Sequence, residues 1–138
     1  MNAKHTNKTL ATLLAFLLGT LGFHRFYVYG RKDIGGWTHI LSLPISGLIW
    51  LACNEIQPFF AASALLVSAL AGFVEALVTG LTPDEKWDAL HNSVSGTHSE
   101  SGWVLALILV LTLGIGAAIL IFAIARLADL LFTGGAYG

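Results

Sequence analysis

The residues that could take part in chemistry are few, and several lie between residues 19 and 33, in the string GTLGFHRFYVYGRKD. His24 and Arg25 stand at the end of an apolar run there, and Glu75 interrupts a later one. His24 with Glu75 or Asp33 could form an acid–base pair, but an active site also needs a nucleophile or second partner in a pocket. The chain has no HExxH or GxSxG motif, and its five histidines lack the spacing of metal ligands. We therefore expect no enzymatic activity, no catalytic residue, no metal site and no cofactor.

Two other roles remain for this cluster: a structural plug between helix ends, or a set of charges that marks topology and contacts lipid or a partner. A plug would use glycines for close backbone approach, aromatic rings as wedges and a guanidinium for carbonyl groups left free at a helix end. The residues that could build it are Gly19, Gly22, His24, Arg25, Phe26 and Tyr27. Contact with headgroups or a partner would instead use the basic side chains Arg25, Arg31 and Lys32. We favour the plug.

Glu75 also requires an explanation, because an acid within a transmembrane helix is costly unless it is paired or hydrated. It lies six residues before Leu81, where its apolar run ends. The carboxylate could extend to the membrane interface, pair with Arg25, or serve as a proton or cation site. We favour the ion pair, because the apolar run before Arg25 is short and would draw that side chain inward.

The composition is that of a membrane protein. Of the 138 residues, 56% are hydrophobic and 11% are charged, and the mean hydropathy is +0.77. Soluble domains carry about 25% charged residues, so this chain needs the lipid bilayer as part of its solvent. The net charge of −1 gives no electrostatic case for nucleic acid as a partner.

Apolar runs separated by polar breaks predict an all-α integral membrane protein with four transmembrane helices arranged as two hairpins. The chain from residue 34 to residue 81 is too long for one crossing, so the polar stretch around Glu55 must be a turn. The predicted divisions are a two-helix hairpin over 8–56, a third transmembrane helix over 57–81, an interfacial helix with a flexible linker over 82–101, a fourth transmembrane helix over 102–132 and a disordered tail over 133–138.

The connection after the third crossing has the signals of a short helix at the membrane surface. Thr82 and Glu85 have the spacing of a capping box, and Pro83 suits the first turn. Trp87 and Leu90 share one helix face, which we expect to enter the interface.

Small residues recur at every fourth position of the third predicted crossing. Such a stripe allows close approach of helix backbones, which is a main source of helix association in lipid. We expect this face to pack on a neighbour, either a partner membrane protein or a second copy, through Ala64, Ser68, Gly72, Ala76 and Gly80.

Four crossings place both termini on one side of the membrane and the loops 24–34 and 82–101 on the other. The loop side would then carry four basic residues, Arg25, Arg31, Lys32 and Lys86. The terminal side would carry three, Lys4, Lys8 and Arg126. The positive-inside rule predicts cytoplasmic loops, in a bacterial-type inner membrane or a plasma membrane.

The first third of the chain resembles the two-transmembrane, or TM-2, domain family over about residues 8 to 56. The resemblance is carried by Lys8, Gly19-x-x-Gly22-x-His24-Arg25-Phe26-Tyr27, Gly30-Arg31, Gly35-Gly36 and Trp50. Two positions depart from the family pattern: Val28-Tyr29 stands where Leu-Gly is usual, and Asn54 stands where an acid is usual, with Glu55 adjacent. The family implies a helical hairpin that serves as a module in membrane proteins, and it implies no enzymatic reaction.

These features predict a non-catalytic integral membrane protein, a scaffold or accessory subunit of a membrane complex or homo-oligomer. The alternative is a small transporter or channel component, which would need polar groups near the midplane that face a cavity. The sequence offers His39, Ser42, Ser46 and Ser68 for that purpose.

Overall fold

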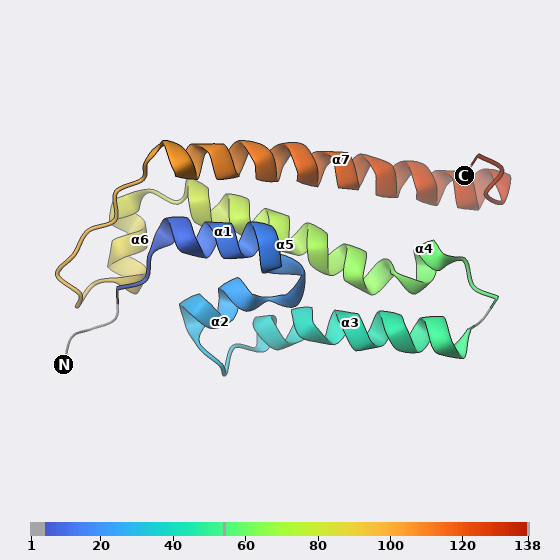
Figure 1. The fold of residues 1–138 in the computed structure, drawn as a ribbon, viewed down its shortest axis with the longest axis horizontal. Helices are drawn as coiled ribbons and strands as arrows, with labels where there is room; N and C mark the ends of the chain where they lie inside the picture. The colour runs from blue at the N-terminus through green and yellow to red at the C-terminus, as the bar shows by residue number, and fades with distance from the viewer. Residues whose placement is uncertain (1–4, 54, 138) are drawn as a thin grey trace.

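A computed structural model describes residues 5–53 and 55–137, and all the regular elements among these residues are helical. Four of the helices are short and three are long, with a 3₁₀ turn between the first two (Figure 1). In chain order they are α1 (Lys8–Leu18), η1 (Gly19–Leu21), α2 (Phe23–Tyr29), α3 (Ile34–Ala52), α4 (Pro58–Ala61), α5 (Ser63–Leu81), α6 (Asp84–His91) and α7 (Trp103–Thr133).

Among the described residues, the helices long and apolar enough to cross a membrane are α3, α5 and α7. These helices make the chain a membrane protein. The α-helical part of the first apolar run is 11 residues long and rises about 16 Å, against a hydrocarbon core of about 30 Å. The predicted arrangement of four transmembrane helices in two hairpins is therefore not confirmed.

The first apolar run ends early because the backbone turns at Gly22. A 3₁₀ turn precedes it, and Gly22 has φ of +70°, a left-handed conformation that glycine adopts without strain. A Cβ atom at Gly22 would also lie 2.7 Å from the carbonyl oxygen of Gly36. Helix α2 then runs back beside α1, so that the hydroxyl of Tyr27 accepts a hydrogen bond from the Asn7 N–H at 3.0 Å (Figure 1).

The start of the chain lies at the same end of the molecule as α6. The Thr6 N–H donates to Asn92 Oδ1 at 2.7 Å, and its carbonyl accepts from the indole of Trp87 at 3.0 Å. Helix α7 runs from this end to the opposite one, where the described chain finishes (Figure 1). The expectation that both termini share one side is therefore not confirmed, because the described chain begins and finishes at opposite ends of the molecule (Figure 1). The loops 24–34 and 82–101 do share an end, as the ring contact between Tyr29 and His91 shows.

Helix α5 lies at the centre, and its small residues are the side packed against the N-terminal part of the chain. Ser68, Gly72, Ala76 and Gly80 are buried, and Ala64 is half-buried. The predicted packing face is present, but the elements that cover it are α1, η1 and α7 of the same chain. The same chain therefore covers most of this face, and the half-buried Ala64 is the member that is least covered.

Helix α6 is held in place by the packing of Trp87 against the N-terminal segment, and the predicted capping box does not form. The hydroxyl of Thr82 donates to the Val78 carbonyl at 2.7 Å, so it turns back into α5. The residue before α6 is Pro83, which provides no side-chain cap. Trp87 is buried against the N-terminal segment, whereas Leu90 is exposed.

Two aspartates of α6 form hydrogen bonds with the start of α1 and with the linker before α7. The ammonium of Lys8 donates to Asp84 Oδ1 at 2.5 Å, and this bond lowers the pKa of Asp84. Asp88 accepts from the N–H and hydroxyl of Ser99, both at 2.6 Å, and these bonds lower its pKa to about 2. Both carboxylates are thus ionised where they bind the linker that precedes α7.

Replacing Gly72 with alanine should destabilise the protein. The new Cβ would lie 2.8 Å from the Cα of Gly19, and a backbone atom cannot move aside as a side chain can. Overpacking of this kind costs about 1–3 kcal/mol. Gly114→Ala is the matched control, because a Cβ at that position of α7 meets nothing within 4 Å.

Thermal unfolding in detergent measures the difference. We expect a lower Tm for Gly72→Ala and an unchanged or higher Tm for Gly114→Ala. Equal Tm values for both variants and the parent protein would contradict the close approach of α5 to Gly19.

Candidate functional site

The candidate site is a polar cluster where α2, α3 and α5 meet inside the apolar bundle. Helix α2 brings His24 and Arg25 to this point because the chain reverses at Gly22. The ring of His24 is buried, with 4% of the residue exposed. The guanidinium of Arg25 lies against the first turn of α3, where a side chain at Gly35 would collide with it.

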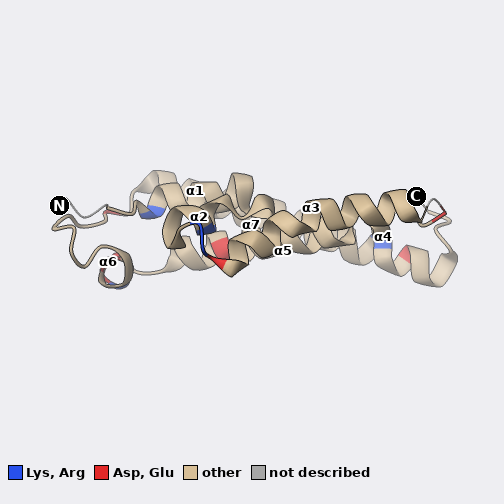
Figure 2. Cartoon of the chain, turned by 90° about the horizontal axis from the view of Figure 1, so that it is seen from below, with Lys and Arg blue, Asp and Glu red and all other residues tan. Residues whose placement is uncertain are grey.

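Arg25 forms ion pairs with two carboxylates. Its Nη1 donates to Glu75 Oε1 at 2.6 Å, and its Nε and Nη2 donate to Asp33 at 2.7 and 3.3 Å. Figure 2 shows basic and acidic positions side by side where α2 meets α5. The predicted ion pair between Arg25 and Glu75 is confirmed, and these donors bind carboxylates instead of helix-end carbonyls.

Asp33 joins this ion pair to the start of α3. Its carboxylate accepts the Gly36 N–H at 2.7 Å, which makes it the N-cap of the helix. The hydrogen bond from Arg25 is the main cause that lowers the pKa of Asp33. The same two bonds to Asp33 raise the pKa of Arg25 further, so both groups are charged.

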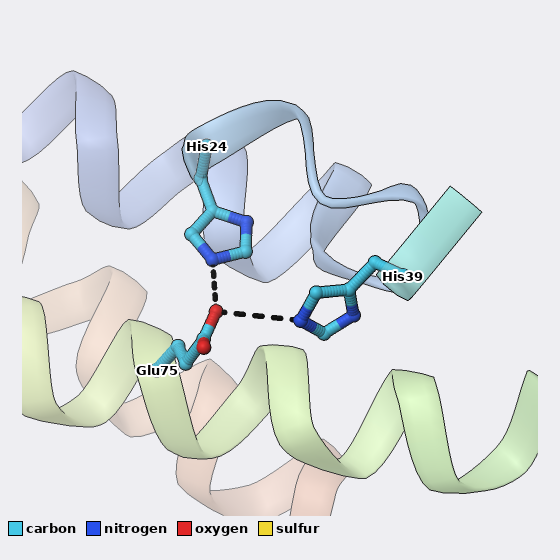
Figure 3. Close-up of side chains that lie close together, drawn as sticks. All are labelled: His24, His39 and Glu75. Carbon is cyan, nitrogen blue, oxygen red and sulfur yellow. Dashed lines mark hydrogen bonds and ion pairs between the residues drawn. The ribbon is translucent and has the colours of Figure 1, made fainter. Parts of the chain in front are cut away.

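The second oxygen of Glu75 faces two histidines, one from α2 and one from α3 (Figure 3). His24 Nε2 is hydrogen-bonded to Oε2, and His39 Nε2 lies 3.5 Å from the same atom. Both rings are buried. One nitrogen of each ring and one carboxylate oxygen lie within 4.8 Å of one another, so these residues form a group that could hold a metal ion.

The other nitrogen of His39 belongs to a hydrogen-bond chain that crosses to α5 and η1. His39 Nδ1 lies 2.7 Å from the hydroxyl of Ser68, which donates to the Thr20 carbonyl at 2.7 Å. The order Ser68, His39, Glu75 is that of a hydrolase triad, but the direction of the proton is different. Because Ser68 gives its proton to Thr20, His39 is not placed to remove it, and the hydroxyl is not an activated nucleophile.

A groove of about 560 Å³ between α3 and α5 leads to this cluster. Small, hydroxyl and β-branched side chains line most of it, and Glu75 and His39 lie at its polar part. The other lining residues are Gly35, Thr38, Ser42, Ile45, Ser63, Ala64, Val67, Ser68 and Ala71.

The remaining residues of the predicted plug lie around the cluster. The ring of Phe26 packs under Gly36, where a Cβ would lie 2.6 Å from it, and contacts Trp37 edge to face. Tyr27 binds the N-terminal segment, and Gly19 touches the backbone of Gly72. Arg31 has an exposed side chain away from these contacts, and only its carbonyl takes part, by accepting the Trp37 indole N–H at 2.9 Å.

Three contributors, Asp33, His39 and Ser68, were named from the sequence only for other roles and not as members of this cluster. Asp33 had a signal, because an aspartate directly before an apolar helix is a favoured N-cap. His39, Ser42 and Ser46 follow helical spacing and are all buried, so one polar face of α3 was visible in the pattern. The contact between Ser68 and η1 depends on the turn at Gly22 and had no local signal.

Residues 4–52 match the family model of the TM2 domain. The match confirms the resemblance noted in the sequence, and it ends at the last residue of α3. The comparisons with curated proteins and with solved structures give no match. The TM2 segment supplies His24, Arg25, Asp33 and His39, whereas Glu75 comes from α5, outside it.

Glu75→Gln should destabilise the protein, because it removes the carboxylate that joins Arg25 and the two histidines. The loss of one hydrogen bond to a charged group costs about 1.5–3 kcal/mol. Glu85→Gln is the matched control, since Glu85 is exposed on α6. Thermal unfolding in detergent should show a lower Tm for Glu75→Gln alone, and the same Tm for both variants would contradict the role of the ion pair.

Proposed function

We propose that this membrane protein, with its TM2 domain over residues 4–52, is a non-catalytic scaffold or accessory subunit. In this proposal the polar cluster fixes the TM2 domain on α5, and the groove between α3 and α5 receives a helix of a partner or of a second copy.

The groove is the observation that carries the proposal. It lies between two helices that are long enough to cross a membrane, and small residues such as Ala64 and Ala71 leave it hollow. The hydroxyl oxygens of Thr38, Ser42, Ser63 and Ser68 along it can accept hydrogen bonds from a neighbouring helix. Close approach of backbones and such hydrogen bonds are the main sources of helix association in lipid.

The polar cluster supports a structural role better than a reactive one. Its charged groups, Arg25, Asp33 and Glu75, bind one another across three elements. An ion pair of half-buried groups at membrane depth favours one arrangement of the helices, because any other arrangement would leave a charge unpaired.

The distribution of basic residues supports a cytoplasmic location for the end that carries α6. With α1 not crossing, five of the described basic residues belong to α1, α2, the loop after α2 and α6, and one belongs to the far part of α7. The five are Lys8, Arg25, Arg31, Lys32 and Lys86, and the sixth is Arg126. By the positive-inside rule the N-terminal segment and the loops 24–34 and 82–101 face the cytoplasm of a bacterial-type inner membrane or a plasma membrane.

Filling the groove should break the association. In mild detergent, we expect the parent protein to purify as an oligomer or with one stoichiometric partner band, measured by light scattering and gel analysis. Ala64→Leu should abolish this, because its side chain enters the groove. Ala118→Leu is the matched control on α7, at an exposed position outside the groove. A parent protein that is monomeric and alone would contradict the proposal.

A second function, a small transporter or channel component, is favoured by one feature of the same groove. Its lining includes Glu75 and His39, which are ionisable groups at membrane depth, together with Ser42 and Ser68. Such groups commonly mark pathways for ions or protons. Proteoliposomes of the pure protein should show no ion or solute flux above the Glu75→Gln variant if the scaffold proposal holds, and Glu75-dependent flux would favour the transporter.

A further inference from the structure

The cluster around Glu75 contains an arrangement of atoms that the ion pair with Arg25 does not explain. Arg25 occupies Oε1 of the carboxylate, and the other oxygen, Oε2, faces Nε2 of both His24 and His39 (Figure 3). What occupies the space between these three atoms depends on which of them carry protons.

The hydrogen bonds of the chain fix the proton of His39. The Thr20 carbonyl can only accept, so the single proton of Ser68 goes to it. Ser68 must then accept from His39 Nδ1, which therefore carries a proton. In the neutral ring Nε2 is consequently a bare lone pair, and it points at the negatively charged Oε2 of Glu75 at 3.5 Å. A proton on Nε2 or a metal ion between the two atoms would remove the repulsion of these electron-rich groups.

His24 can complete the same site. Its ring is 4% exposed, and its Nδ1 is buried without a hydrogen-bond partner among the described residues. In the metal-free chain Nε2 donates its proton to Glu75 Oε2. A metal ion would replace this proton, since a histidine binds metal through a deprotonated nitrogen. Two imidazole nitrogens and one carboxylate oxygen then converge from α2, α3 and α5.

The charge of the cluster also favours a cation. One guanidinium, on Arg25, faces the two carboxylates of Asp33 and Glu75. With neutral histidines the cluster carries a net charge of −1, by the sum of +1 and −2. In a membrane interior such a charge is costly unless a further positive ion is bound.

We propose that His24, His39 and Glu75 bind a divalent transition-metal ion of the zinc type. Two imidazoles and one carboxylate are a ligand set that Zn²⁺ uses, with a water at the fourth position. Ligand atoms about 2.0–2.1 Å from a tetrahedral ion lie about 3.3 Å from one another. His39 and Glu75 are 3.5 Å apart, and the three candidate atoms lie within 4.8 Å of one another, so small side-chain movements would bring all three to this spacing. The bond from His39 Nδ1 to Ser68 is the outer contact that orients a metal-binding histidine.

The site also has a route of entry. Glu75 and His39 line the groove between α3 and α5, so an ion and its water can reach the ligands from there. The metal site does not depend on the proposed scaffold role, since it uses the inner end of the groove and requires no partner.

The test is metal binding by the tag-free, full-length protein in detergent, after treatment with chelator. We expect one Zn²⁺ per chain by equilibrium dialysis with elemental analysis, and visible absorption bands of tetrahedral Co²⁺ when Co²⁺ replaces it. Removing a residue that only orients a metal ligand typically weakens metal binding about 10–100-fold. His39→Gln removes a ligand itself, so it should weaken Zn²⁺ binding by at least that factor. His98→Gln is the matched control, because His98 is exposed and lies outside the cluster.

Three results would overturn the proposal: no stoichiometric metal on the parent protein, equal binding by His39→Gln, or loss of binding in His98→Gln.

Circular dichroism shows whether each variant is folded. If His39→Gln does not fold, Ser68→Ala decides, because it removes the bond that orients His39. Binding about 10–100-fold weaker in Ser68→Ala supports the site, and unchanged binding contradicts it. If a proton occupies the place of the metal, the parent protein will bind no metal and its thermal stability will depend on pH. That outcome contradicts the proposal.

Discussion

The carboxylate of Glu75 sets the main constraint on this fold. It lies in α5, a helix that is otherwise apolar and long enough to cross a membrane, so it must be paired within the protein. Its partners come from the TM2 domain: Arg25 and His24 on α2 and His39 on α3. The turn at Gly22 brings them to α5.

The thickness of the bilayer sets a second constraint on the fold. Helix α1 is too short to cross, and the chain can stop at mid-depth only where its free backbone and polar groups find partners within the protein. The turn after α1 places these groups next to α5. There the hydroxyl of Ser68 donates to the Thr20 carbonyl, which the 3₁₀ turn leaves free. The TM2 domain is thus completed by α5, a helix outside the matched residues. In this chain the matched segment therefore depends on a helix that lies beyond its C-terminal boundary.

The hydropathy pattern was sufficient to predict the long helices. The free-energy cost of a charge within the membrane was sufficient to predict the ion pair between Arg25 and Glu75. They did not predict that the chain turns back directly after the first helix, although the apolar run was visibly short. The decisive feature is the left-handed Gly22, whose conformation is set by its contact with Gly36 on the next helix. The grouping of His39 with His24 and Glu75 was not predicted for a related reason: the three residues lie on three elements, and only the folded chain brings them together. At Thr82 a local bond to Val78 replaced the predicted cap.

The central claim is that the TM2 domain folds back on α5 and leaves three crossings, so the side on which the N-terminal segment lies is the most direct test. Single cysteines at His5, Ser93 and Ala136, in a Cys53→Ser background, can be labelled with a membrane-impermeant maleimide in sealed, oriented vesicles. We expect positions 5 and 93 to react from the same side and position 136 from the other, with labelling of all three after the vesicles are opened. Reaction of positions 5 and 136 from one side, with 93 on the other, would show that the first helix crosses the membrane and would contradict this account.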